Sequence, residues 1–166
     1  MKKIVLLLIL GLSACSMLSA DMVFVVITGL DEQLLKENHQ VRDMVFSLES
    51  GAMDAFFETG HVVTNYGISY VKASDALRLG KNSNADFLLA IRIDFVLKNE
   101  VYSLERVSYS YLNVVSETEL YSGELDASDI CEEADLLKAC MDFGVRLAKA
   151  CIYEQGKTVS LYGTGF

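Results

Sequence analysis

The stretch Phe87-Leu88-Leu89-Ala90-Ile91-Arg92-Ile93-Asp94-Phe95-Val96-Leu97 decides the fold of this chain. Every second residue from Phe87 to Leu97 is large and apolar, and side chains two apart on a strand point to the same face. The pattern therefore predicts a strand with one face in the core. Residues 101–115 and 118–125 read as two further strands behind short turns. Three sequential strands with short connections predict an antiparallel meander.

Upstream of the meander, strands and helices alternate. Residues 22–28 form a nearly continuous apolar run rich in valine, which predicts a buried strand. Apolar residues then recur at helical spacing over 41–56, and Gly60 closes this helix. A short strand is expected at 62–65. A second, shorter helix is expected at 74–81, with Gly80 as the glycine that ends it. Residues 31–40 are mostly polar, and the sequence does not decide their secondary structure.

The last helix is predicted at 129–152, where apolar residues line one broad stripe and Asp129 with Glu132 gives an N-terminal capping pattern. The element order is then β-α-β-α-β-β-β-α. This order predicts an α/β (α+β) fold with the architecture of a two-layer sandwich, in which helices cover a sheet that contains the antiparallel three-strand meander.

The start of the sequence has the layout of an export signal. Met1-Lys2-Lys3 is basic, and the apolar run over 4–12 is far shorter than the roughly 20 residues that a membrane-spanning helix needs. The next residues, Leu12-Ser13-Ala14-Cys15, resemble the bacterial lipobox. In that motif the cysteine thiol receives diacylglycerol before cleavage, and the small residues fit the peptidase. A soluble exported protein in which Cys15 is incidental is the alternative.

The lipobox divides the chain. We expect a lipoprotein signal peptide at 1–14, lipidation at Cys15, a lipidated tether at 15–21 and a single globular α/β domain at 22–166. Two or three acyl chains, such as palmitate, make a durable anchor. Because Ser16 follows the anchor cysteine, we expect the protein to be located in the bacterial cell envelope, attached to the outer membrane and facing the periplasm.

The charge balance is acidic. The chain has 14 Lys and Arg against 23 Asp and Glu, a net charge of −9. Removing the signal peptide with Lys2 and Lys3 leaves 12 basic against 23 acidic residues, a net charge of −11. Such a surface repels phosphates, so we expect no nucleic-acid partner.

Several stretches resemble a group of envelope proteins. Residues 76–81 (ALRLGK) followed by 85–89 (ADFLL), and residues 113–123 (NVVSETELYSG), are similar to segments of that group. It comprises the curli-secretion lipoprotein, the lipoprotein activator of penicillin-binding proteins and the amino-terminal domain of the Tol-system periplasmic protein. The resemblance implies an α/β sandwich that binds other envelope proteins without catalysis. Two departures are Asn113, where the group has an acidic residue, and Glu117, where it has a turn glycine.

No catalytic or metal-binding motif stands out. His39 and His61 lack the spacing of metal ligands, and Gly80-Lys81 lacks the rest of a phosphate-binding loop. The acidic residues near the last helix lack the calcium-loop pattern and are explained by capping: Asp126, Asp129, Glu132, Glu133 and Asp135. We therefore expect no enzyme activity, no cofactor and no metal.

Three cysteines lie on the last predicted helix. The nearest pair, Cys131 and Cys140, would be roughly 13 Å apart, too far for a disulfide. We expect Cys140 and Cys151 to be thiols in the core. Cys131 falls on the solvent-exposed side of the helix and is the candidate reactive thiol; the alternative is that Cys131 is an unreactive surface thiol.

Tyrosines gather on the meander and form either a binding face or a core layer beneath a helix: Tyr102, Tyr109, Tyr111 and Tyr121. Together these observations predict a membrane-anchored, non-catalytic lipoprotein that binds or scaffolds other envelope proteins. The alternative is a lipoprotein that binds a small ligand, which would need a pocket with convergent polar groups.

Overall fold

The computed structural model describes residues 20–67, 71–98, 101–127, 130 and 135–162. Its centre is a five-stranded sheet in the order β2-β1-β3-β4-β5. The strands are β1 (Met22–Thr28), β2 (Val62–Asn65), β3 (Phe87–Lys98), β4 (Val101–Asn113) and β5 (Thr118–Asp126). The helices are α2 (Glu32–Glu37), α3 (His39–Glu58), α4 (Ala73–Asn82) and α5 (Leu136–Tyr162).

The sheet is mixed. The predicted meander is confirmed, since β3 pairs antiparallel with β4, and β4 pairs antiparallel with β5. The strand β1 lies between β2 and β3 and pairs parallel with both. Its side chains are buried on both faces, which explains its continuous apolar sequence. The two sheet edges are therefore β2 and β5.

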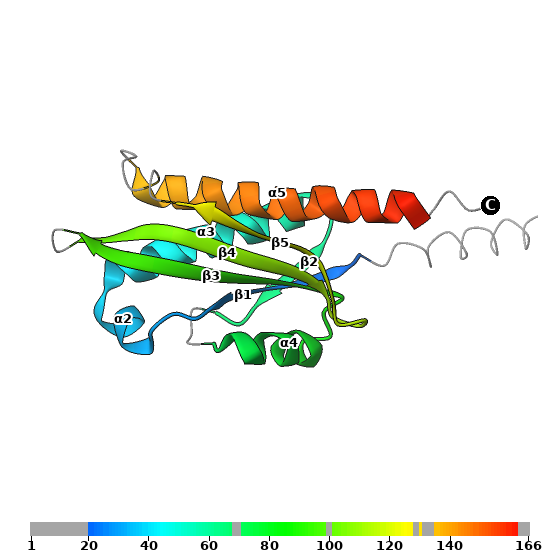
Figure 1. The fold of residues 1–166 in the computed structure, drawn as a ribbon, viewed down its shortest axis with the longest axis horizontal. Coiled ribbons are helices and arrows are strands. Elements are labelled where there is room, and N and C mark those ends of the chain that lie inside the picture. Colours follow the sequence, from blue (N-terminus) through cyan, green and yellow to red (C-terminus); the bar gives the residue numbers. More distant parts are fainter. Residues whose placement is uncertain (1–19, 68–70, 99–100, 128–129, 131–134, 163–166) are drawn as a thin grey trace, which may run out of the picture.

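Helices cover both faces of the sheet, to different extents. The helices α3 and α5 pack side by side on one face and enclose the main core, whereas α4 covers part of the opposite face (Figure 1). Under α4 lies a smaller core that includes Phe24, Val26 and Leu88. The predicted α/β sandwich is thus confirmed, and α4 adds a short layer on its second face.

The alternating stretch in β3 behaves as predicted over most of its length. Leu89, Ile91 and Ile93 are buried in the main core. Leu97 is an exception, because more than half of its surface is exposed. A β-bulge shifts the pairing with β4 between Asp94 and Phe95, and the hairpin beyond it extends past the covering helices (Figure 1). Placing Leu97 in the core was therefore wrong.

Helix boundaries differ from the predicted ones, most of all in the last helix. The last helix begins at Leu136 instead of Asp129, because Asp135 caps it by accepting the Lys138 N–H. Its end also differs, since the helix continues to Tyr162 and not only to Ile152. The open segment 31–40 holds α2 and the start of α3. Asp31 and Asn38 cap these helices through hydrogen bonds of 2.9 Å to backbone N–H groups.

Another difference concerns Gly80, which lies inside α4 and not at its end. The helix continues to Asn82, and a Cβ on Gly80 would be 3.5 Å from Val114. The glycine therefore serves the close approach of α4 to the sheet. The turn after α4 is made by Asn84, whose φ of 55° lies in the left-handed region that asparagine tolerates.

Two glycines bring α3 and α5 into backbone contact. A Cβ on Gly51 of α3 would lie 2.0 Å from the Met141 carbonyl oxygen, and a Cβ on Gly144 of α5 would lie 2.1 Å from the Leu48 carbonyl oxygen. No side chain fits at either position. This contact lets both helices reach the same face of the sheet.

The β4–β5 turn accounts for the two departures from the envelope group. Glu117 has a φ of 57°, in the left-handed region where the resemblance places glycine. Asn113 accepts the Ser116 N–H through its side-chain oxygen at 2.8 Å. Either an asparagine or an acidic side chain supplies that acceptor, so both residues fit one turn geometry.

Candidate functional surface

The sequence-predicted site residues fall in two groups. Cys15 and Cys131 lie outside the described residues, so lipidation and a reactive thiol stay predictions. Cys140 and Cys151 are buried in the main core, as expected, and form no disulfide within the described residues. Burial raises the pKa of the Cys151 thiol to about 12, which keeps it protonated and unreactive at neutral pH.

The meander tyrosines pack beneath the helices. Tyr111 is fully buried and stacks between Phe56 and Phe87, with ring centroids 5.8 Å and 5.5 Å away. Its hydroxyl donates to the Gln155 side chain of α5 at 2.9 Å. Tyr109 is also buried, against Tyr121. The core-layer interpretation therefore holds for these residues.

The two histidines have ordinary local partners. His61 packs edge-on against Phe56 and lies within hydrogen-bond distance of the Thr59 hydroxyl, and His39 contacts Arg42. Among the described residues no group of three His, Cys, Asp or Glu side chains could hold a metal ion. Within the same residues, no helix is long and apolar enough to cross a lipid bilayer.

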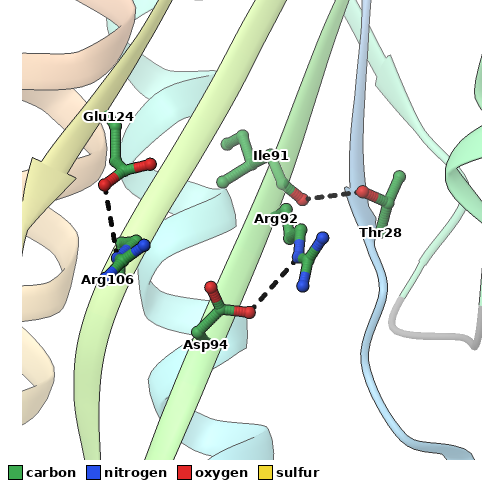
Figure 2. Close-up of polar contacts among 6 residues, drawn as sticks. All are labelled: Thr28, Ile91, Arg92, Asp94, Arg106 and Glu124. Carbon is green, nitrogen blue, oxygen red and sulfur yellow. Dashed lines mark hydrogen bonds and ion pairs between the residues drawn. The ribbon is translucent and has the colours of Figure 1, made fainter.

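The sheet face that α4 leaves uncovered is polar. Arg92 pairs with Asp94 at 3.2 Å, and Arg106 on β4 pairs with Glu124 on β5 at 3.3 Å (Figure 2). All four side chains are substantially exposed, and such pairs contribute little to stability. Their charges balance, so this face has the character of the solvated side of an antiparallel sheet.

A shallow hollow of about 440 Å³ lies between α2 and β4 and is open to solvent. Its lining is acidic, with Asp31 and Glu37 beside Leu34 and Tyr102. Asp31 is already engaged as the cap of α2. The hollow offers no enclosed volume in which polar groups would converge on a small ligand.

An exposed apolar row runs along α3. Phe46, Met53 and Phe57 are spaced by 7 and 4 residues, which puts them on one face of the helix. Phe46 is 57% and Phe57 73% exposed, and Met53 is half-buried. We call these three residues the outer row. Clustered exposed apolar side chains mark interaction surfaces on soluble domains.

The edge strand β2 lies next to α3 and is open on its other side. Val62 donates its N–H to the Asp21 carbonyl at 3.0 Å, so this residue faces β1. Backbone groups alternate in direction along a strand, and Thr64 therefore also faces β1. The N–H and C=O groups of Val63 and Asn65 point away from β1, and no described residue pairs with them.

A buried carboxyl group lies between the outer row and the core. Glu49, one turn from both Phe46 and Met53 on α3, is only 2% exposed. The side chain of Asn65 on β2 lies close enough to this carboxyl to lower its pKa. In the described part of the chain its Oε1 atom has no hydrogen-bond partner. Loss of hydration raises the pKa of Glu49, against a smaller lowering by Asn65.

This carboxyl predicts a pH-dependent stability. The pKa of Glu49 is raised in the folded state, so its contribution to the free energy of unfolding is fully favourable below the unfolded pKa of about 4.5. This contribution is lost as the pH rises through the higher folded pKa. Glu49→Gln should therefore stabilise the protein by about 1–2 kcal/mol at pH 7 and by much less at pH 4. Urea unfolding at both pH values measures this.

The matched control is Glu58→Gln, which removes an exposed carboxylate from the same helix. It should change the unfolding free energy by less than about 0.5 kcal/mol at either pH. An equal gain from both substitutions, or a Glu49→Gln gain that does not shrink at pH 4, would show that burial of Glu49 carries no cost.

The outer row and the β2 edge were missed by the sequence reasoning. The signal for the outer row was present, since Phe46, Met53 and Phe57 repeat at helical spacing on a side of α3 away from its core stripe. The open edge had no local signal, because it depends on which strands become neighbours.

Comparison with known proteins leaves the family open and supports the fold. No protein-family model matches the chain, and no curated protein sequence does. Among solved structures, a PelC dodecamer from Paraburkholderia phytofirmans, which carries one leucine-to-methionine substitution, matches with a TM-score of 0.50 and 17% identity. The match covers 78% of this chain and 87% of that chain. At this identity it shows a shared fold only.

Two further matches are weaker. Lipoprotein GNA1162 from Neisseria meningitidis has a TM-score of 0.44 and 12% identity, over 84% of this chain and 99% of that chain. TolB from Acinetobacter baumannii has a TM-score of 0.41 and 12% identity, over 82% of this chain and 28% of that chain.

Proposed function

We propose that the chain is a lipoprotein of the bacterial cell envelope, anchored through Cys15, that binds other envelope proteins and performs no catalysis. The observation that carries the binding role is the outer row of α3 beside the outer edge of β2, which pairs with no described residue; together we call them the α3–β2 surface. An apolar row and free backbone groups at one place fit a protein partner better than a small ligand.

The proposed anchor is compatible with the position of the domain. Six residues separate Cys15 from Met22, the first residue of β1, and they can span at most about 21 Å. The domain would thus stay close to the membrane. The start of β2 pairs with Met22, so the binding surface lies near the tethered end.

Protein assembly is known for a chain of this fold, since PelC has been solved as a dodecamer. That observation supports a binding role for the fold, and for this chain the partner is proposed to be a different protein. The alternative of a small-ligand lipoprotein finds less support, because the hollow beside α2 is open and lined by acidic side chains.

Lipidation is tested by Cys15→Ser in the producing bacterium. We expect the substitution to abolish incorporation of labelled palmitate and to leave an unprocessed or soluble form, because serine lacks the thiol that accepts diacylglycerol. Membrane fractionation of the wild-type chain should place it with the outer membrane. Cys140→Ser is the matched control, since that thiol is buried in the core. Unchanged labelling of the Cys15→Ser chain would refute the anchor.

A further inference from the structure

The end of the domain where β1 begins supports an inference about its position on the membrane, which rests on the proposed anchor at Cys15 and makes it more specific. We infer that this end lies against the bilayer that holds the lipid, with Val115 inserted among the lipid headgroups, and that the β3–β4 hairpin points away from the membrane. The backbone, the exposed side chains and the length of the tether each bear on one part of this inference.

One row of backbone hydrogen bonds crosses the sheet at the start of β1. Val62 donates its N–H to the Asp21 carbonyl at 3.0 Å. Asp86 donates to the Met22 carbonyl and accepts the Val114 N–H, both at 2.9 Å. Neighbouring strands are about 4.8 Å apart, so the start of β1 and the β4–β5 turn are separated by roughly 10 Å. We call this row, together with the β4–β5 turn, the tethered end; it lies at the right in Figure 1, where α5 also ends.

The β4–β5 turn carries an apolar side chain at its tip. Val115 is 81% exposed, the largest fraction for any large apolar side chain in the described part of the chain, although Val114 before it is buried against α4. Turn positions usually hold small or polar residues, so the turn itself does not require this valine. Val62, on the other side of β1, is 46% exposed. The tethered end therefore presents apolar side chains on both sides of the chain start.

The polar groups around Val115 are already paired with one another. The Ser116 hydroxyl lies 2.7 Å from that of Thr118, and Lys81 near the end of α4 forms an ion pair with Glu117. Removing water from a polar group is less unfavourable when the group keeps a hydrogen-bond partner. The turn can therefore enter the headgroup region with little loss, whereas its valine is stabilised by leaving water.

The tether keeps this end of the domain within reach of the membrane. Six residues separate Cys15 from Met22 and span at most about 21 Å. The tip of the β3–β4 hairpin lies farther away, because the 12 residues of β3 cover about 40 Å. Leu97 at that tip is 57% exposed, but only the tethered end stays near the bilayer in every orientation of the domain.

A contact made by a single valine is weak, and the anchor makes it effective. A short flexible tether holds the second contact at an effective concentration on the order of millimolar. The bilayer is therefore sampled continuously by the tethered end, and a small stabilisation of Val115 in the headgroup region biases the orientation of the whole domain.

The charge of the chain selects the kind of lipid. Asp21 is exposed at the tethered end, and the chain has a net charge of −9, which repels anionic headgroups. A zwitterionic headgroup such as phosphatidylethanolamine is not repelled, and its ammonium group can accept a carboxylate as a partner. The inferred surface is thus a zwitterionic bilayer.

The chain contains no tryptophan, which allows a direct test of this orientation. Val115→Trp and the matched control Leu97→Trp each introduce a single fluorophore at an exposed position, at opposite ends of the domain. The full-length lipidated chain is reconstituted in vesicles of phosphatidylethanolamine and phosphatidylcholine, with or without bromine on the acyl chains near the headgroup. We expect bromine to quench the Val115→Trp chain at least about twofold and the Leu97→Trp chain hardly at all. Tryptophan favours the interface, and because both variants share that tendency, their difference reports the orientation.

A second measurement tests the valine without placing tryptophan on it. In the Val62→Trp chain the fluorophore lies at the tethered end, and bromine should quench it as well. Adding Val115→Asp should reduce this quenching at least about twofold, because a carboxylate is disfavoured in the headgroup region when it has no partner. Adding Leu97→Asp instead should leave it unchanged, since Leu97 lies at the opposite end.

Two outcomes would overturn the inference: quenching of the Val115→Trp chain that does not exceed that of the Leu97→Trp chain, and quenching of the Val62→Trp chain that Val115→Asp leaves unchanged. The anchor is judged separately, by flotation of the same chains with the vesicles. A chain that floats and gives either outcome keeps the anchor and loses the orientation. A chain that does not float contradicts the proposed anchor and, with it, this inference.

Discussion

Gly144→Ala should destabilise the folded protein by about 3 kcal/mol, at the upper end of the usual cost of overpacking. The added methyl group would lie 2.1 Å from the Leu48 carbonyl oxygen and 2.9 Å from the Ala52 nitrogen, and both are backbone atoms of α3. A flexible side chain could move aside, but a helix backbone cannot without separating α3 from α5. The gain in helix propensity, about 1 kcal/mol, is smaller than this cost.

Chemical denaturation of the wild-type and variant chains measures the difference, together with a melting temperature that should fall by about 10 °C for a domain of this size. Gly156→Ala is the matched control on the same helix. Its Cβ would meet no atom within 4 Å, so it should be neutral or stabilise by up to about 1 kcal/mol. Equal stabilities of the Gly144 and Gly156 variants would contradict the close contact of the two helices.

Ile93→Asp should cost more than about 4 kcal/mol and leave little folded protein. Ile93 is 3% exposed, on the β3 face that α3 and α5 cover. The substitution removes apolar burial and introduces a carboxylate into the core without a partner. Circular dichroism should show loss of the mixed α/β signal at room temperature, or a much lower midpoint in urea.

Leu97→Asp tests the same strand outside the core. Leu97 is four residues further along β3, beyond the bulge, and is more than half exposed. We expect its replacement to cost less than about 1 kcal/mol. A folded Ile93→Asp protein, or a Leu97→Asp protein that unfolds as readily, would show that the covered face of β3 has been assigned wrongly.

Much of this fold could be predicted from local patterns. Alternation defined β3, and turn residues defined β4 and β5 to within two residues at each end. The strand β2 was predicted with the bounds that the structure shows. The alternation along β3 is a strong signal because Leu89, Ile91 and Ile93 all face the main core.

The errors arose where a local signal had two meanings. Gly80 was taken as a helix end, but it allows α4 to approach the sheet closely. Asp129 was taken as a helix cap, whereas Asp135 caps α5. Both residue types serve either role, and only the neighbours in space distinguish them. The same holds for Gly51 and Gly144, whose function depends on the opposite helix.

The binding surface was less predictable than the fold. The parallel pairing of β1 with β2 and β3 determines which strand becomes an edge, and these contacts join residues far apart in sequence. The buried position of Glu49 likewise depends on Asn65 of β2. Neither the edge nor the buried carboxyl leaves a trace in residue spacing.

Photo-crosslinking in the producing bacterium tests the central claim most directly, that this domain is held at a membrane and binds another protein through the α3–β2 surface. A benzoylphenylalanine is placed at position 57 of the full-length chain, or at position 115 as the control, because both side chains are largely exposed. We predict one discrete protein adduct from position 57, in the membrane fraction, that Val63→Pro removes, and none from position 115. No adduct from position 57, or the same adducts from both positions, would contradict the account.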